Sequence, residues 1–258
     1  MKEGNNMLVV IDIGNTSIAI GLSENLEKLD KVYRINTEKT KSSDEYAIIL
    51  NEMIKTVNRA IISSVVPELN EVFREYFLKR FSLTPFFLGT GVKTGIRIYA
   101  DNPKEVGTDI IGNSIAATQI YNTTCLVIDL GTATTFTYLE DMNLKGVIIS
   151  PGLTTSRNAL ISKTSLLPQV DLDVPSKLLG TNSSDSIKSG LVFGHASMID
   201  GMIARIKSNL KKPDLTVILT GGHAKLIHPH CTMKMTFDET LILKGLLLVA
   251  KLNPERKK

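Results

Sequence analysis

Hydrophobic and polar residues alternate in short blocks near the start of the chain. Residues 8–13 (Leu-Val-Val-Ile-Asp-Ile) and 17–22 (Ser-Ile-Ala-Ile-Gly-Leu) are apolar and rich in β-branched side chains, and Gly14 and Asn15 stand between them. Such runs, bounded by turn residues, predict two strands joined by a tight glycine turn. The rest of the first half predicts, in chain order, a helix at 43–58, a strand at 59–66, a helix at 67–81 and a strand at 85–88.

The second half repeats this opening pattern. Residues 125–130 (Cys-Leu-Val-Ile-Asp-Leu), Gly131 and residues 134–139 (Thr-Thr-Phe-Thr-Tyr-Leu) again predict strand, turn and strand. A repeat separated by nearly half the chain indicates two structurally similar domains. Further elements are expected as helices at 110–119, 183–209 and 222–228 and a strand at 215–219. The chain is therefore expected to be α/β, with domains at 1–116 and 117–258.

Composition narrows the functional class without naming it. The chain has 258 residues, of which 43% are hydrophobic, which is enough for a packed core. A net charge of only +4, with Lys and Arg spread along the sequence, predicts no nucleic-acid partner. Asp12 interrupts the first apolar run, and no later run approaches the roughly 18 residues of a membrane span. We therefore expect a cytoplasmic protein with no membrane partner.

The repeated glycine turns suit phosphate groups. A turn between two strands exposes backbone N–H groups, and glycine at Gly14 and Gly131 removes the Cβ that would block an oxyanion. Asp12 and Asp129 stand where strands end and could hold a cation, since Mg²⁺ prefers one or two carboxylates plus phosphate oxygens. Uncharged side-chain donors are added by Asn15, Thr16, Thr132 and Thr134.

A third motif turns these features into a nucleotide hypothesis. One Asp-x-Gly-x-Thr turn is ordinary hairpin chemistry. Residues 217–222 (Val-Ile-Leu-Thr-Gly-Gly) add a buried strand that runs into a glycine pair at a helix start, where a nucleotide can approach the backbone. Neither a P-loop nor a Gly-x-Gly-x-x-Gly motif is present. Two turns and one glycine pair together favour nucleotide binding.

The motifs resemble those of a known superfamily. Asp12-x-Gly14-x-Thr16, Asp129-x-Gly131-Thr132-x-Thr134 and Thr220-Gly221-Gly222 look like the phosphate-1, phosphate-2 and adenosine motifs of the actin-like ATPases. Within that superfamily the chain resembles type III pantothenate kinase. The resemblance to that family is carried also by Ser63–Pro67, Asn102–Asp109, Gly146–Gly152 and Leu167-Pro168.

The resemblance implies a fold, a reaction and a set of residues. The implied fold has two similar actin-like (ribonuclease H-like) domains with ATP in the interdomain cleft. The implied reaction is ATP-dependent phosphorylation of pantothenate to 4′-phosphopantothenate, the first step of coenzyme A synthesis, with Asp109 as catalytic base. Asp129 would contact a monovalent cation (K⁺ or NH₄⁺), and Asp12 would hold Mg²⁺ through phosphate or water. The family also implies a homodimer whose partner subunit helps to close the substrate pocket. The implied ATP-binding residues are Asp12, Ile13, Gly14, Asn15, Thr16, Ser17, Ile18, Ala19, Gly131, Thr132, Gly221 and Gly222. The implied substrate-binding residues are Gly107, Thr108, Asp109, Ile110 and Ser183.

Three positions depart from the family pattern, all on the substrate side. Ile110 stands where the family has Arg after the catalytic Asp, Ala100 replaces a Tyr, and Thr181 replaces a Lys. If the Arg made a direct charge-assisted contact, its loss costs about 1.5–3 kcal/mol. Two alternatives therefore stay open: an actin-like kinase for another small alcohol, and a non-catalytic nucleotide-dependent regulatory protein of the same fold. Asp109 argues against the second alternative, because a binding module needs no base there.

Overall fold

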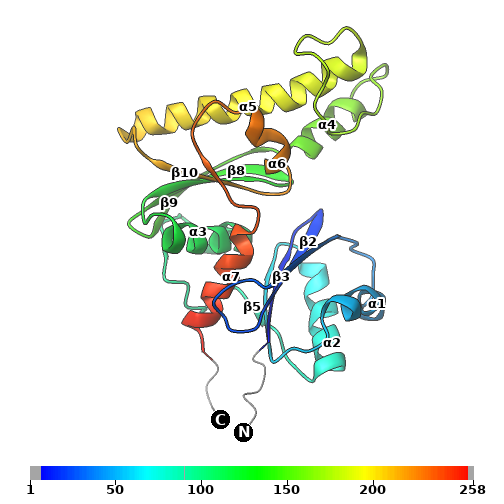
Figure 1. Ribbon diagram of the computed structural model, residues 1–258, viewed down its shortest axis with the longest axis vertical. Coiled ribbons are helices and arrows are strands. Elements are labelled where there is room, and N and C mark those ends of the chain that lie inside the picture. Colours follow the sequence, from blue (N-terminus) through cyan, green and yellow to red (C-terminus); the bar gives the residue numbers. More distant parts are fainter. Residues whose placement is uncertain (1–6, 90, 255–258) are drawn as a thin grey trace. The chain divides into compact units, whose positions relative to one another are not determined.

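The computed structural model describes residues 7–89 and 91–254, which form two compact units (Figure 1). Unit 1 consists of Met1–Ile120 together with Thr240–Lys258, and unit 2 consists of Tyr121–Glu239. Each unit is built around its own β-sheet. The expected α/β architecture is confirmed.

The sheet of unit 1 has the strand order β3-β2-β1-β4-β5. Strand β1 runs antiparallel to β2 and parallel to β4, so that Asp12 near the end of β1 pairs with Ser63 of β4. The carboxyl ends of β1 and β4 therefore lie side by side. The strands span Leu8–Ile13 (β1), Ser17–Ser23 (β2), Lys31–Asn36 (β3), Arg59–Ser64 (β4) and Phe86–Phe87 (β5); the short strand β6 is Arg97–Ile98.

Helices cover both faces of the unit 1 sheet, which explains why β1 is apolar at nearly every position. Val9 and Ile11 pack with the aromatic side chains of α1 and α2, whereas Val10 packs on the other face with α3 and α7. A capping box at Ser42 and Glu45 fixes the start of α1. The helices are α1 (Ser43–Met53), α2 (Asn70–Phe81, preceded by the 3₁₀ turn η1, Pro67–Leu69), α3 (Thr108–Ile120, preceded by η2, Pro103–Glu105) and α7 (Leu241–Leu252).

The C-terminal helix belongs to unit 1, although the expected division at 116/117 placed residues 240–258 with the second half. Helix α7 packs against α3 through two glycines: a Cβ on Gly245 would overlap the backbone of Gly112. Its last carbonyls accept hydrogen bonds from the guanidinium of Arg59, including one of 2.8 Å to the oxygen of Ala250. Helix α7 therefore completes the core of the first unit.

In the sheet of unit 2, neighbouring strands follow the order β11-β10-β7-β8-β9. Alternate residues of β7, among them Leu126 and Ile128, pack with the apolar side of α5, including Val192 and Ile199. Figure 1 shows α5, the long yellow helix, lying across this sheet. The strands are β7 (Cys125–Leu130), β8 (Ala133–Glu140), β9 (Asn143–Pro151), β10 (Thr216–Thr220) and β11 (Thr236–Phe237); the helices are α4 (Leu153–Ser162), α5 (Ser183–Leu210), α6 (Ala224–Ile227) and the 3₁₀ turn η3 (His228–His230).

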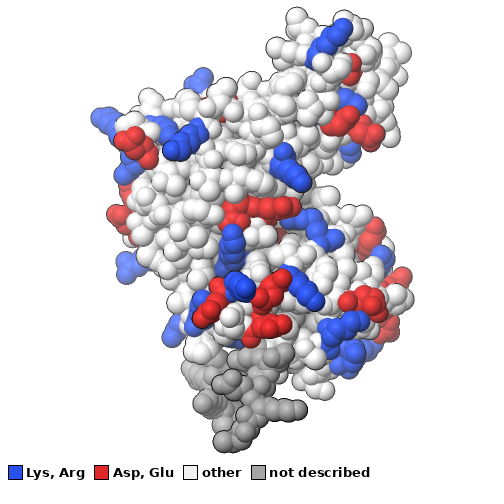
Figure 2. Space-filling view, viewed as in Figure 1, with Lys and Arg blue, Asp and Glu red and all other residues white. Residues whose placement is uncertain are grey.

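Surface charge follows the even distribution seen in the sequence. Figure 2 shows acidic and basic side chains intermixed on the visible face of each unit. Within residues 7–89 and 91–254, no helix has the length and apolar character to cross a membrane.

Candidate active site

The phosphate-1 turn connects β1 to β2 in unit 1. The Gly14 amide donates to the oxygen of Ser17 at 3.0 Å, which closes the turn, and a Cβ on Gly14 would press on that same oxygen. Asn15 and Thr16 are exposed at the tip. Ile18 and Ala19 are buried inside β2, so any ATP contact from these two predicted residues is limited to their backbone. The turn thus offers main-chain groups and neutral side chains to a ligand.

The segment after β3 supports this turn, which the sequence did not reveal. Thr37 donates from Oγ1 to the Gly14 oxygen at 2.6 Å and from its amide to the Thr16 oxygen at 3.0 Å. Lys39 Nζ donates to Asn15 Oδ1 at 3.0 Å. The only available signal was the polar-apolar alternation of residues 31–36, which is typical of an edge strand.

The predicted substrate loop lies at the same edge of the unit 1 sheet as the phosphate-1 turn. Thr108 begins α3 and is held at the end of β4: its Oγ1 lies 3.1 Å from Ser63 Oγ, accepts from the Ser64 amide at 3.2 Å and lies 3.1 Å from the Ser64 oxygen. The neighbouring amide of Val65 donates to the oxygen of Ile13, the last residue of β1, at 3.0 Å. The fold of unit 1 therefore brings the Asp12–Ser17 and Gly107–Ile110 segments to adjacent strand ends.

Asp109 sits in the first turn of α3. Burial raises the pKa of its carboxyl group, and backbone amide hydrogen bonds from Ile110 and from Asp109 itself oppose that rise. The Ile110 amide donates to Asp109 Oδ1 at 2.8 Å. A Cβ on Gly107 would overlap Asp109 Oδ1, so only glycine at position 107 lets the carboxylate adopt this position. A carboxylate with a raised pKa is a stronger base.

The phosphate-2 turn of unit 2 is also closed by its glycine amide, over two residues instead of three. The Gly131 amide donates to the Ala133 oxygen at 3.0 Å, and β7 and β8 pair on either side of it. The start of α4 supports the turn: the Gly152 amide and Thr155 Oγ1 donate to the Thr132 oxygen at 3.1 and 2.7 Å. A side chain at position 152 would overlap the Gly131 and Thr132 carbonyls. Glycine at position 152 is therefore required for α4 to begin against the turn.

The glycine pair after β10 approaches the same turn. Gly221 has φ +101°, and a Cβ there would overlap Asp129 Oδ1 and the backbone of Leu130. The His223 amide donates to the Leu130 oxygen at 3.1 Å. The backbone at Gly221 thus packs closely against the Asp129 carboxylate. Carboxylate and carbonyl oxygens are suitable ligands for a hard cation. Oxygen ligands of this kind suit the monovalent cation that the family resemblance implies at Asp129.

Two histidines lie beside the phosphate-2 turn. His195 Nε2 is 2.8 Å from Thr134 Oγ1, and His223 Nε2 is 3.2 Å from Thr154 Oγ1. Burial lowers the pKa of His195, and protonation of neighbouring His223 would lower it further. Burial likewise lowers the pKa of His223, although the carbonyl of Leu130 opposes it. Both imidazoles are therefore neutral hydrogen-bonding groups at neutral pH.

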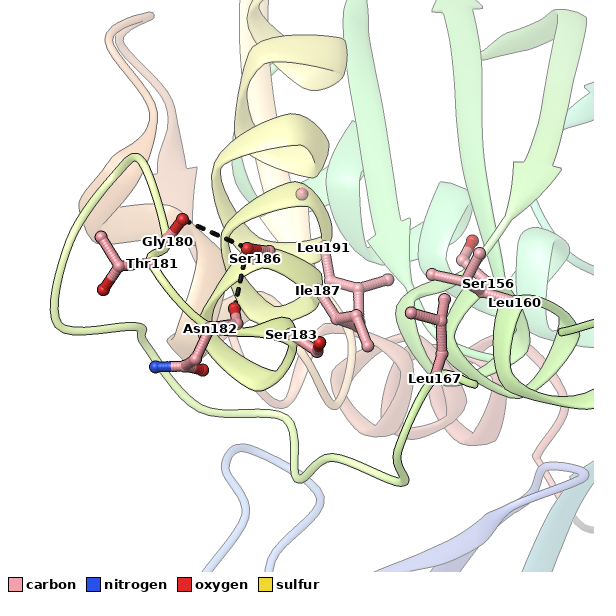
Figure 3. Close-up of a pocket in the computed structure, with 11 residues that line it drawn as sticks. Ser156, Leu160, Leu167, Gly180, Thr181, Asn182, Ser183, Ser186, Ile187 and Leu191 are labelled. Carbon is pink, nitrogen blue, oxygen red and sulfur yellow. Dashed lines mark hydrogen bonds between the residues drawn. The ribbon is translucent and has the colours of Figure 1, made fainter. Parts of the chain in front are cut away.

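Ser183 is separate from these turns in the sequence and lines a pocket within unit 2. The pocket has a volume of about 770 Å³ and lies at the start of α5, where Asn182 caps the helix by accepting from the Asp185 amide at 2.8 Å. Figure 3 shows Ile187 extending from α5 toward Leu167. The residues that line the pocket are Ser156, Leu160, Leu167, Gly180, Thr181, Asn182, Ser183, Ser186, Ile187, Gly190 and Leu191.

Comparison with known proteins identifies the family. The family model described as type III pantothenate kinase matches residues 8–205. The chain belongs to the type III pantothenate kinase family. A relative from Acholeplasma laidlawii named type III pantothenate kinase is 42% identical over 249 residues, covering 96% of this chain and 99% of its own length. Another with the same name, from Citrifermentans bemidjiense, is 39% identical over 255 residues, covering 96% of this chain and 100% of its own.

Solved structures agree on the fold. A Sinorhizobium meliloti protein described as a candidate 2-dehydro-3-deoxygalactonokinase superposes with a TM-score of 0.62 at 12% sequence identity, covering 97% of this chain and 98% of its own. Identity this low supports the fold alone. The fold is that of the actin-like ATPases and sugar kinases, as the glycine-turn motifs predicted.

Proposed function

We propose that this protein is a pantothenate kinase, which transfers the γ-phosphoryl group of ATP to the 4′-hydroxyl of pantothenate in coenzyme A synthesis. The observation that carries the proposal is the family match over residues 8–205, a span that contains both phosphate turns and Asp109. The geometry of unit 1 supports it, because Thr108 is tied to the end of β4 beside the phosphate-1 turn.

Asp109 is the proposed general base. Its carboxylate takes the proton of the attacking hydroxyl as the hydroxyl oxygen bonds to the γ-phosphorus and the bond to the β-phosphate oxygen breaks, releasing ADP. Burial of the carboxyl group raises its pKa, which makes the carboxylate a stronger base. A base of this kind contributes roughly 10²- to 10⁴-fold to the rate. Positioning and charge stabilisation supply most of the remaining acceleration in phosphoryl transfer.

The two turns are the proposed polyphosphate-binding elements. The Gly14 and Gly131 amides close the turns, so the proposed donors to phosphate oxygens are the backbone amides of Asn15 and Thr16 and the hydroxyl and amide side chains of Asn15, Thr16 and Thr132. Asp12 is proposed to hold Mg²⁺ through phosphate or water, and Asp129 to bind K⁺ or NH₄⁺. These cations, when bound, neutralise negative charge on the nucleotide.

The acceptor specificity is the part of the proposal that Ile110 bears on most directly. Arg at that position in the family would offer a charge-assisted bond to a carboxylate, and isoleucine cannot. Other basic residues then have to receive the pantothenate carboxylate. Weaker pantothenate binding, by roughly ten- to a hundredfold, is expected if nothing replaces the Arg.

A coupled assay for ADP formation tests the function. Turnover is measured with pantothenate and with other small alcohols, with and without K⁺, for the wild type and Asp109→Asn. Turnover on pantothenate that falls at least about a hundredfold in Asp109→Asn, with ATP binding retained, supports the proposal. Turnover on another alcohol alone identifies a different kinase. ATP binding without turnover on any acceptor identifies a regulatory protein.

We also propose that the protein is a homodimer that works in the cytoplasm. Leu166 and Leu179 of unit 2 are 92% and 84% exposed, and the pocket lined by Ser183 adjoins these segments in sequence. Burying such side chains against a second copy recovers about 25 cal/mol per Å² of apolar surface. Light scattering after size exclusion should give a dimer for the wild type and a monomer for Leu179→Asp. Ile48→Asp, at a site in unit 1 that is 75% exposed, is the matched control and should remain dimeric.

A further inference from the structure

Two cationic side chains converge on the phosphate-1 turn. Lys39 Nζ donates to Asn15 Oδ1 at 3.0 Å, and Arg34 Nη1 donates to Ser17 Oγ at 3.0 Å. Both cations are exposed, and both are bound to neutral side chains of the turn. Within the described residues neither has a carboxylate partner within 4.0 Å, whereas Lys79 pairs with both Asp44 and Glu75. The two cations are therefore held at the turn without being neutralised there.

The turn itself supplies no positive charge. Its donors are backbone amides and the side chains of Asn15, Thr16 and Ser17, which are all neutral. A nucleoside triphosphate remains strongly anionic even with Mg²⁺ bound, so a cation that reaches the same place adds electrostatic attraction that amides cannot give. A lysine on a flexible stem is a common phosphate ligand because its ammonium acts as a point charge.

The backbone around Lys39 is fixed to the turn, which limits where its ammonium can go. Two residues before it, Thr37 donates to the oxygens of Gly14 and Thr16. The Glu38 amide donates to Tyr46 Oη at 3.0 Å, and the same hydroxyl donates to the Glu38 oxygen at 3.0 Å. The chain at 37–38 is thus anchored on one side to the phosphate-1 turn and on the other side to α1. This anchoring keeps the side chain of Lys39 within reach of the turn.

We propose that Lys39 is a polyphosphate-binding residue of the nucleotide site, with Asn15 holding its ammonium at the phosphate-1 turn. The inference rests on the proposed function, because the turn must hold a nucleotide for Lys39 to meet it. Lys39 determines how tightly the phosphates bind and leaves the adenosine portion to other residues. A merely structural lysine would instead affect all nucleotides equally, or affect the stability of unit 1.

Lys41 provides a matched control. It carries the same charge two residues further along the loop, and its electrostatic attraction is to Glu45 at the start of α1. No hydrogen bond links its ammonium to the phosphate-1 turn in the described structure. Replacing Lys41 therefore removes the same net charge without removing the proposed phosphate contact.

Direct titration of the full chain with MgATP, MgADP and adenosine distinguishes a phosphate-binding Lys39 from a structural one. Lys39→Met should bind MgATP about tenfold more weakly, or about 1.4 kcal/mol, the lower range expected for an exposed charge-assisted contact. MgADP should lose less than MgATP if the ammonium meets the γ-phosphate, and adenosine binding should change less than about twofold. Lys39→Arg should recover most of the affinity, and Lys41→Met should match the wild type. In turnover, the ATP KM should rise about tenfold while the pantothenate KM stays constant.

The outcomes are distinguishable from those that test the proposed function. A wild type that binds no nucleotide refutes the proposed function and this inference together. A wild type that binds MgATP, with Lys39→Met binding it equally well, refutes only the role of Lys39. Equal losses for MgATP and adenosine, or a lowered melting temperature that explains both, also overturn it by making Lys39 a structural residue.

Discussion

Replacing Gly221 by alanine should damage both the stability of unit 2 and the phosphate-2 turn. Gly221 has φ +101°, in the left-handed region that residues with a Cβ rarely adopt. An added Cβ would also overlap Asp129 Oδ1 and the main chain of Leu130, where its distance to the carbonyl carbon would be 2.7 Å. Because part of this overlap is with backbone, a rotamer change at Asp129 cannot relieve it, and either β10 or the turn must move.

The magnitude follows from two terms. A non-glycine residue held at such a φ costs about 1–3 kcal/mol, and overpacking that moves backbone costs a further 1–3 kcal/mol or so. We therefore expect Gly221→Ala to lower the free energy of unfolding by about 2–6 kcal/mol. At roughly 2–4 °C per kcal/mol for a protein of this size, the melting temperature should fall by at least about 4 °C.

Gly222→Ala is the control that isolates this cause. Gly222 is the next residue, its φ lies outside the left-handed region, and a Cβ there would meet no atom within 4 Å. Its free energy of unfolding should change by less than about 1 kcal/mol. Urea denaturation followed by circular dichroism measures both variants, and titration with MgATP should show weaker binding for Gly221→Ala only. Equal stability of the two variants would refute the close approach of Gly221 to Leu130.

Three further predictions test other parts of the structure. Gly107→Ala should lower kcat by tenfold or more, because the added Cβ overlaps Asp109 Oδ1. The melting temperature should stay within about 2 °C of the wild type, because the flexible carboxylate can move aside. An unchanged kcat would contradict the placement of the Asp109 carboxylate beside Gly107. Ser42→Ala should destabilise the protein by about 1 kcal/mol in urea denaturation, since it removes the capping box with Glu45 at α1; a loss below about 0.3 kcal/mol would argue against that box. Asp109→Asn should gain stability relative to the wild type as pH rises above about 4, the usual pKa of an Asp in an unfolded chain. Burial raises the folded-state pKa of Asp109, so the folded wild type binds the proton more tightly than the unfolded chain and loses stability as pH rises through that folded-state pKa. A stability difference that is flat with pH, measured by urea midpoints, would show that Asp109 is not desolvated.

The glycine turns and their strands could be predicted from sequence because the features that define them are local. Strands 8–13 and 125–130 are found at the expected positions, and the long helix expected at 183–209 extends over Ser183–Leu210. The helix expected at 67–81 begins as a 3₁₀ turn, since Pro67 cannot donate a hydrogen bond and suits a first turn. The helix expected at 43–58 ends at Met53, where Ile54 turns to an extended conformation.

Elements whose position depends on distant contacts could not be predicted. Residues 241–252 have one polar side, marked by Lys244 and Lys251, but that pattern does not say which sheet the apolar side covers. Their place in unit 1 depends on Gly245 meeting Gly112, more than a hundred residues away. The role of Thr37 at the phosphate-1 turn also depends on a distant contact and could not be predicted. Its contacts with Gly14 and Thr16 exist only because β3 returns alongside β2.

The two glycine turns resemble each other in sequence more than they do in their structural surroundings. The surroundings differ in the residues that support each turn from outside. Each turn closes on itself in the same way, with a glycine amide donating to an oxygen two or three residues later. The outer support differs: Thr37, from the segment after the next strand, holds the first turn, whereas Thr155, from a helix, holds the second. The segment that supports the first turn is polar and exposed, and it places Lys39 beside the proposed phosphate site. The second turn is supported by α4, where Thr154 lies against the neutral imidazole of His223. Sequence comparison between the two halves therefore finds the groups that they share and misses the residues that support each turn from outside, Thr37 in the first half and Thr155 in the second.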